Sequence, residues 1–200
     1  MVERNMKKNC KGTIILTSRG LNSKTGNKLI WKKIRRIFGE EIGEKIILLV
    51  IPPSYSDTIT NIIVDACGMA GLKKENIKVN DLSVNPDIIY VGEGNATIIL
   101  DFLNNSKLFD CIKKRMMMEN CVYIGASAGA MIAGKDIQIA LELESNEALL
   151  EEFSALELFD GVAIPHYSRA DLNRYLMNTD INTKRYNSII SVGEEQIIVL

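Results

Sequence analysis

VYIGASAGAMIAG, residues 122–134, joins a strand-like run to a helix-compatible run through a series of small residues. Within it, Gly125, Ser127 and Gly129 meet the pattern Gly-x-Ser-x-Gly. Small neighbours let the backbone turn sharply, so that a serine hydroxyl projects from a nucleophile elbow. We then expect the amide of Ala128, at the helix start, to donate to an oxyanion. The same residues also suit a plain helix–sheet packing turn or a phosphate-binding loop.

Strand-like apolar runs alternate with helix-like segments along the whole chain. Such alternation predicts βαβ units, and hence a three-layer α/β/α fold with a mostly parallel sheet, in a single domain spanning residues 1–200. Ligands of such sheets gather at the carboxyl ends of the strands. The predicted strands are 12–18, 45–53, 76–82, 86–95 with its glycine loop, 120–127, 159–167 and 195–200. The predicted helices are 27–39, 56–72, one or two within 96–120, and one after residue 127.

The charge balance argues against nucleic-acid or membrane partners. The 200 residues hold 24 Lys and Arg against 25 Asp and Glu, a net charge of −1, so no strong field attracts polyanions. The apolar runs are too short to span a bilayer, and residues 1–12 lack the apolar core of an export signal. Four scattered cysteines then indicate free thiols in the cytoplasm. With one histidine and dispersed cysteines, we expect no metal and no cofactor.

A serine nucleophile needs a base, and histidine is the usual one. His166, the only histidine, follows a short apolar strand in VAIPHYSR and so lies at a strand end, as Ser127 does. A lone histidine is otherwise a surface or structural residue. A third residue, a carboxylate, should orient the imidazole, and spacing alone does not choose among the candidates. These are Glu142, Glu144, Asp160, Glu194 and Glu195.

Two further segments supply candidate binding groups. The loop YVGEGN, residues 90–95, offers the amide of Gly94 as a second oxyanion donor, since glycine allows close backbone approach. Asn95 is either the N-cap of the next helix or a substrate-binding residue. Arg169 and Arg174 follow the histidine, and an arginine fork can bind a substrate carboxylate with two hydrogen bonds. The alternative for each arginine is a solvated surface charge.

The motifs VGEGN, GASAGA and IPHY, in that order, resemble those of peptidase family S51, which holds the aspartyl dipeptidases (peptidase E) and the cyanophycinases. The resemblance implies a fold like that of the class I glutamine amidotransferases, with serine in place of cysteine. It also implies Ser127 as nucleophile and His166 as base. The acid that it implies is Glu194, just before the last apolar run, with Glu142 as the reserve, 15 residues after the serine.

The resulting hypothesis is a serine peptidase that hydrolyses short peptides, with Asp-Xaa dipeptides as the expected preference, acting as a monomer or homodimer. One alternative is a non-catalytic binding module, because Glu93 places a carboxylate in the glycine loop where the family has glycine. The other alternative is an esterase or amidase that acts on a small metabolite.

Overall fold

The computed structural model describes residues 7–178 and 183–200, and within them the strands form a six-stranded and a two-stranded sheet. In spatial order the larger sheet consists of β3 (Ile77–Val79), β2 (Ile47–Val50), β4 (Ile88–Val91), β5 (Val122–Ala126), β1 (Thr13–Thr17) and β8 (Ile197–Val199). Neighbouring strands run parallel except β8, which pairs antiparallel with β1. The predicted mostly parallel sheet is confirmed.

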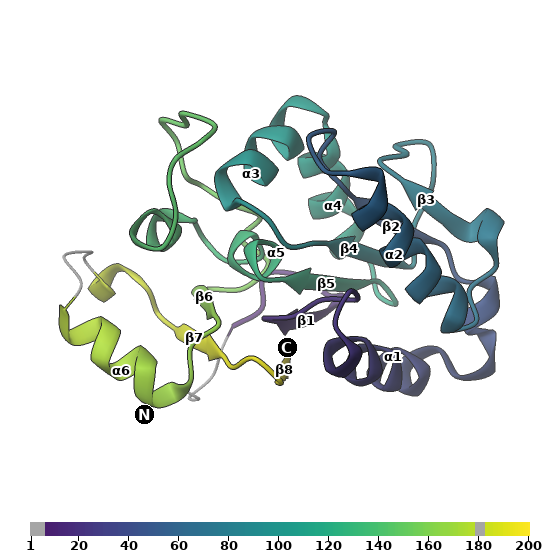
Figure 1. The fold of residues 1–200 in the computed structure, drawn as a ribbon, viewed down its shortest axis with the longest axis horizontal. Helices are drawn as coiled ribbons and strands as arrows, with labels where there is room; N and C mark the ends of the chain where they lie inside the picture. The colour runs from purple at the N-terminus through teal and green to yellow at the C-terminus, as the bar shows by residue number, and fades with distance from the viewer. Residues whose placement is uncertain (1–6, 179–182) are drawn as a thin grey trace.

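Helices cover both faces of this sheet. On one face pack α1 (Lys24–Phe38) and α2 (Asp57–Met69), and on the other pack α3 (Ala96–Asn105), α4 (Leu108–Met116) and α5 (Ala128–Ile132). Figure 1 shows α3 and α4 above the sheet and α1 beneath it. This arrangement is the three-layer α/β/α fold that the sequence predicts.

The sheet is apolar on both faces because successive strand residues point to opposite sides. In β1, Ile14 and Leu16 enter the core with α3, α4 and α5, whereas Ile15 enters the core with α1 and α2. All three side chains are fully buried. Continuous Val, Ile and Leu runs, as in β2, are the sequence signature of strands that are covered on both sides.

The carboxyl ends of β1, β4 and β5 meet at one edge of the sheet. Gly125 of β5 lies opposite both Leu16 of β1 and Val91 of β4. The residues that follow these strands are therefore neighbours in space: the segment after Thr17, the glycine loop after Val91, and Ser127. This edge is where a parallel sheet binds its ligands.

The two-stranded sheet consists of β6 (Val162–Pro165) and β7 (Ile189–Val192), which run parallel. Pro165 pairs with Val192, so the residues that follow the two strands, His166 and Gly193–Glu194, also lie close together. The sequence predicted β6 but not β7. β7 is four residues long and only half of its positions are buried.

The chain also contains elements for which no prediction was made. These are α6 (Arg169–Asn178) and the 3-10 helices η1 (Gly39–Glu44), η2 (Lys74–Asn76), η3 (Gln138–Glu142) and η4 (Thr183–Arg185). No helix in the described ranges is long and apolar enough to cross a membrane. Of the amino-terminal stretch predicted to lack an export signal, residues 1–6 lie outside the described residues.

Candidate active site

Ser127 stands between the end of β5 and the start of α5, in an unusual backbone conformation. Its φ is 50° and its ψ is −112°, a region that residues other than glycine rarely occupy. Its amide donates to the carbonyl oxygen of Thr17 at 2.9 Å. Gly129 permits the close approach of α5 to β4, since a Cβ there would lie 2.1 Å from the carbonyl oxygen of Val91. The structure therefore has the strand–turn–helix context that the elbow pattern requires.

His166 follows β6 directly and also has a positive φ, of 65°. Its backbone amide donates to the hydroxyl of Ser18, at 2.8 Å. Its ring atom Nε2 lies 2.9 Å from Oγ of Ser127. The structure thus brings together the predicted nucleophile and the predicted base, from residues that are 39 positions apart in the chain.

Glu194 lies in the turn between β7 and β8, and its Oε1 is 2.9 Å from Nδ1 of His166. Its other oxygen, Oε2, accepts a hydrogen bond from Nε of Arg19 at 2.6 Å. The hydrogen bond from His166, followed by that from Arg19, lowers the pKa of this carboxyl below its ordinary value. Glu194 is therefore ionised at neutral pH.

The other candidate carboxylates lie elsewhere. Glu142 is exposed at the end of η3, and Glu195 is exposed beside Glu194. Glu144 accepts a hydrogen bond from the amide of Ala96, and burial raises the pKa of its carboxyl. Asp160 accepts one from the side chain of Asn187, at 2.6 Å.

The chemistry of Ser127, His166 and Glu194 determines which group donates and which accepts in each of their hydrogen bonds. An ionised carboxylate only accepts, so Nδ1 of His166 carries the hydrogen that faces Glu194. In the neutral ring Nε2 is then an acceptor, and the hydroxyl of Ser127 is its donor. This is the protonation pattern in which an imidazole can take a proton from a serine.

The two predicted oxyanion donors lie on adjoining segments. Ala128 is the first residue of α5, and such amides have no acceptor within their own helix. Gly94 has a φ of 137°, and a Cβ there would lie 1.3 Å from the hydroxyl of Tyr55. The amide of Gly129 donates to the carbonyl of Gly92 at 3.1 Å, which joins the elbow to the glycine loop.

Glu93 faces the segment after β1. Its Oε1 accepts from the amide of Gly20 at 2.9 Å, and its Oε2 accepts from the side chain of Asn22 at 2.7 Å. Both oxygens therefore have donors from the chain itself. A carboxylate held in this way ties the glycine loop to residues 20–22.

Asn95 is the N-cap of α3. Its Oδ1 accepts from the amides of Thr97 and Ile98, at 2.9 and 3.2 Å, and its amide group donates to the carbonyl of Ser145 at 2.9 Å. The sequence left two roles open for Asn95, the N-cap of the helix and substrate binding, and the structure shows the N-cap.

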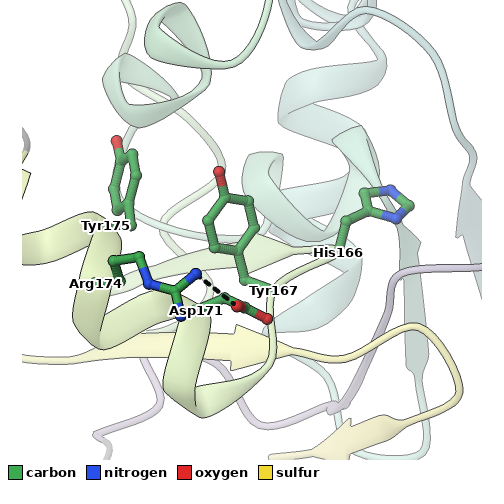
Figure 2. A pocket seen from close by; sticks show the side chains of 5 residues that line it. All are labelled: His166, Tyr167, Asp171, Arg174 and Tyr175. Atoms are coloured by element: carbon green, nitrogen blue, oxygen red, sulfur yellow. Dashed lines mark ion pairs between the residues drawn. The ribbon is translucent and has the colours of Figure 1, made fainter.

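A pocket of about 420 Å³ lies beside the histidine, lined by His166, Tyr167, Asp171, Arg174 and Tyr175. Arg174 lies 3.8 Å from Asp171, one turn earlier on α6. Figure 2 shows this ion pair, with the imidazole of His166 pointing away from it. Arg169, at the exposed start of α6, is not among the lining residues.

The contribution of the end of β1 and of the residues that follow it was not predicted from the sequence. Thr17, Ser18 and Arg19 each contact a different member of the site. A signal for it was present, because the polar residues Ser18 and Arg19 follow β1 and strand ends converge in a parallel sheet. Only the pairing of β1 with β5, however, shows that this strand end is the relevant one. In the described ranges, no three His, Cys, Asp or Glu side chains are grouped so as to hold a metal ion.

An α/β fold with a serine, a histidine and a glutamate in hydrogen-bond contact at a strand-end turn is the architecture of a serine hydrolase. The model of peptidase family S51 matches residues 14–200. The chain belongs to peptidase family S51.

Individual relatives agree with this assignment. An uncharacterized peptidase of Pasteurella multocida is 31% identical over 93 residues, 46% of this chain and 44% of that protein. A probable alpha-aspartyl dipeptidase of Drosophila melanogaster is 33% identical over 79 residues, 40% of this chain and 32% of that protein. The matches thus span less than half the length of these curated relatives.

Solved structures share the fold over nearly the whole chain. A candidate peptidase E from Listeria monocytogenes has a TM-score of 0.69 at 20% identity, covering 98% of this chain and 95% of the other. A peptidase from an acI-B1 actinobacterium has a TM-score of 0.66 at 16% identity, covering 97% and 85%. At these identities the likeness concerns the fold.

Proposed function

We propose that this protein hydrolyses peptide bonds in short peptides, with Ser127 as the nucleophile. The observation that carries the proposal is the unbroken series of hydrogen bonds from Ser127 through His166 to Glu194, with both ring nitrogens at 2.9 Å from their partners. These distances lie within hydrogen-bond reach, which is the geometric requirement for a nucleophile and its base.

The reaction follows from this arrangement. Oγ of Ser127 bonds to the scissile carbonyl carbon while its proton passes to Nε2 of His166. The carbon–nitrogen bond then breaks, and the imidazolium returns the proton to the leaving amine. Water repeats the two steps on the serine ester and releases the acid. Glu194 stays ionised throughout and stabilises the imidazolium.

The amides of Ala128 and Gly94 are proposed to hold the oxyanion of the tetrahedral intermediate. Their support is their placement on adjoining segments, joined by the bond from Gly129 to Gly92. Loss of one such donor typically raises the barrier by about 2.7–4 kcal/mol. The two oxygens of Glu93 have donors of their own, which supports an oxyanion site that this carboxylate does not occupy.

We further propose that a peptide with an amino-terminal aspartate is the preferred substrate. The support is Arg174, which lines the pocket beside His166 and can offer a fork of donors to a carboxylate. The name of the Drosophila relative, an aspartyl dipeptidase, points the same way. Arg169 lies outside the pocket lining and supplies the matched control.

Hydrolysis of matched substrates tests the proposal. We expect Asp-Leu to be cleaved faster than Asn-Leu and Leu-Leu by the wild-type protein, and none to be cleaved by Ser127→Ala. Arg174→Gln should remove the preference for Asp-Leu, whereas Arg169→Gln should keep it. Equal rates on the three dipeptides would contradict the proposed preference for aspartate but not the proposed peptidase activity.

Two other results would replace the proposal. Turnover of a small ester or amide without any dipeptide cleavage would indicate an esterase or amidase. A wild-type protein that binds dipeptides and leaves them intact would indicate a binding module.

A further inference from the structure

Four successive residues, from Thr17 at the end of β1 to Gly20, each hold a different part of the site. The carbonyl of Thr17 binds the amide of the nucleophile, the hydroxyl of Ser18 binds the amide of the base, the guanidinium of Arg19 binds the acid, and the amide of Gly20 binds the glycine loop. The partners are Ser127 at 2.9 Å, His166 at 2.8 Å, Glu194 at 2.6 Å and Glu93 at 2.9 Å. Residues 17–20 therefore contact Ser127, His166, Glu194 and the glycine loop without supplying a reacting group.

Arg19 is the member of this segment that acts through a charged side chain. Its side chain is 57% exposed and that of Glu194 is 45% exposed. Exposed ion pairs contribute little to stability, because water screens them. The contact between Arg19 and Glu194 is therefore better explained by geometry than by the free energy of folding.

The relevant geometry is the orientation of the plane of the Glu194 carboxylate. Glu194 lies in an exposed turn, and its side chain rotates about three bonds. One hydrogen bond to His166 leaves the carboxylate free to turn about that contact. A second bond, from Arg19 to the other oxygen, fixes the plane with Oε1 at Nδ1.

We propose that Arg19 is a positioning residue, which holds Glu194 so that His166 keeps its hydrogen on Nδ1 and its lone pair on Nε2. This inference rests on the proposed function, in which Nε2 takes the proton of Ser127. Without Arg19 the carboxylate rotates away part of the time. The imidazole then also populates the tautomer with hydrogen on Nε2, which cannot accept a proton from the serine.

His166 makes a direct measurement feasible, because it is the only histidine in the chain. With ¹⁵N-labelled histidine, the nitrogen spectrum of the neutral ring reports which nitrogen carries the hydrogen, with no assignment step. We expect hydrogen on Nδ1 in the wild-type protein and a mixture of tautomers in Arg19→Ala. Glu194→Gln, which removes the carboxylate, should give a similar or larger change.

Kinetics should show the same dependence. In Arg19→Ala we expect kcat to fall roughly 10–100-fold, the size typical of a small misplacement of a catalytic group, with KM unchanged. Arg19→Lys keeps a cationic donor and should restore part of both the kcat and the Nδ1 tautomer. Arg36→Ala, at an exposed arginine of α1, is the matched control and should change neither.

Two results would overturn the inference. One is an Arg19→Ala protein with the wild-type tautomer and kcat. The other is an Arg19→Ala protein that raises KM alone, which would make Arg19 a substrate-binding residue. The nitrogen spectrum is read without substrate, whereas loss of the proposed function would appear as absent turnover in the wild-type protein. The two failures are therefore distinguishable.

Discussion

At the scale of single residues, the site depends on backbone conformations that side chains usually avoid. Ser127 and His166 both have positive φ, 50° and 65°. The sequence around Ser127 predicts the turn, because glycine and alanine residues surround the serine. Nothing in IPHY predicts the conformation of His166, whose amide donates to the hydroxyl of Ser18, a residue 148 positions away in the chain.

The strain at Ser127 predicts a stability difference between two inactive variants. Ser127→Ala and Ser127→Gly both lack the hydroxyl, but only glycine adopts φ 50°, ψ −112° without strain. We expect the free energy of unfolding of Ser127→Gly to exceed that of Ser127→Ala by about 1 kcal/mol. This value is at the low end for relief of such strain, because glycine also gains conformational freedom in the unfolded chain. Urea denaturation measures it. Equal stability would mean that the turn is unstrained.

The choice of acid predicts a selective loss of activity. In Glu194→Gln we expect kcat to fall roughly 10²–10⁴-fold, because an amide cannot stabilise the imidazolium as a carboxylate does. Glu195→Gln and Glu142→Gln remove exposed carboxylates and should keep activity within about twofold of the wild type. Steady-state kinetics on one dipeptide compares them. If Glu142→Gln is inactive and Glu194→Gln is active, the assignment of the acid is wrong.

At the scale of elements, the sequence predicted the parts whose signals are local. Continuous apolar runs marked β1, β2, β4 and β5, and Gly39 marked the end of α1. Among the elements without a prediction, β7 is short and α6 is largely polar. Of α6 only Leu172 is buried among the residues described, so no apolar stripe distinguishes it from a loop. Pairing between distant segments, such as β6 with β7, has no local signal.

Two helical glycines differ in the space around them, and we expect their substitution by alanine to change the free energy of unfolding in opposite directions. In Gly129→Ala a Cβ would lie 2.1 Å from a backbone oxygen that cannot move aside, so we expect a loss of about 1–3 kcal/mol in free energy of unfolding. In Gly68→Ala, within α2, nothing lies within 4 Å. That change should add about 0.5–1 kcal/mol. Thermal and urea unfolding measure both, and a stable Gly129→Ala would contradict the close packing.

At the scale of the whole molecule, the site spans two sheets. Ser127 follows a strand of the six-stranded sheet, whereas His166 and Glu194 follow the strands of the small sheet. Ser18 joins the two, since its hydroxyl donates to the carbonyl of Val192 and accepts from the amide of His166. The docking of the sheets therefore sets the distances within the site.

This docking predicts a pH dependence of stability. The folded-state pKa of Glu194 is lowered, first by the hydrogen bond with His166. Its contribution is therefore present above the unfolded pKa of about 4.3 and is lost as the pH falls through the folded pKa. At pH 6 we expect the free energy of unfolding of the wild-type protein to exceed that of Glu194→Gln by only about 0.2–1 kcal/mol, because the pair of His166 and Glu194 is exposed. The difference should shrink in acid. A difference that grows as the pH falls would contradict the sign.

Active-site labelling tests whether Ser127 is an activated nucleophile, without requiring the natural substrate. A fluorophosphonate reacts with an activated serine, and mass spectrometry of the digested protein locates the adduct. We predict one adduct, on Ser127, in the wild-type protein and none in folded Ser127→Ala or His166→Ala. A folded wild-type protein that takes no adduct, or an adduct on another serine that persists in Ser127→Ala, would contradict it.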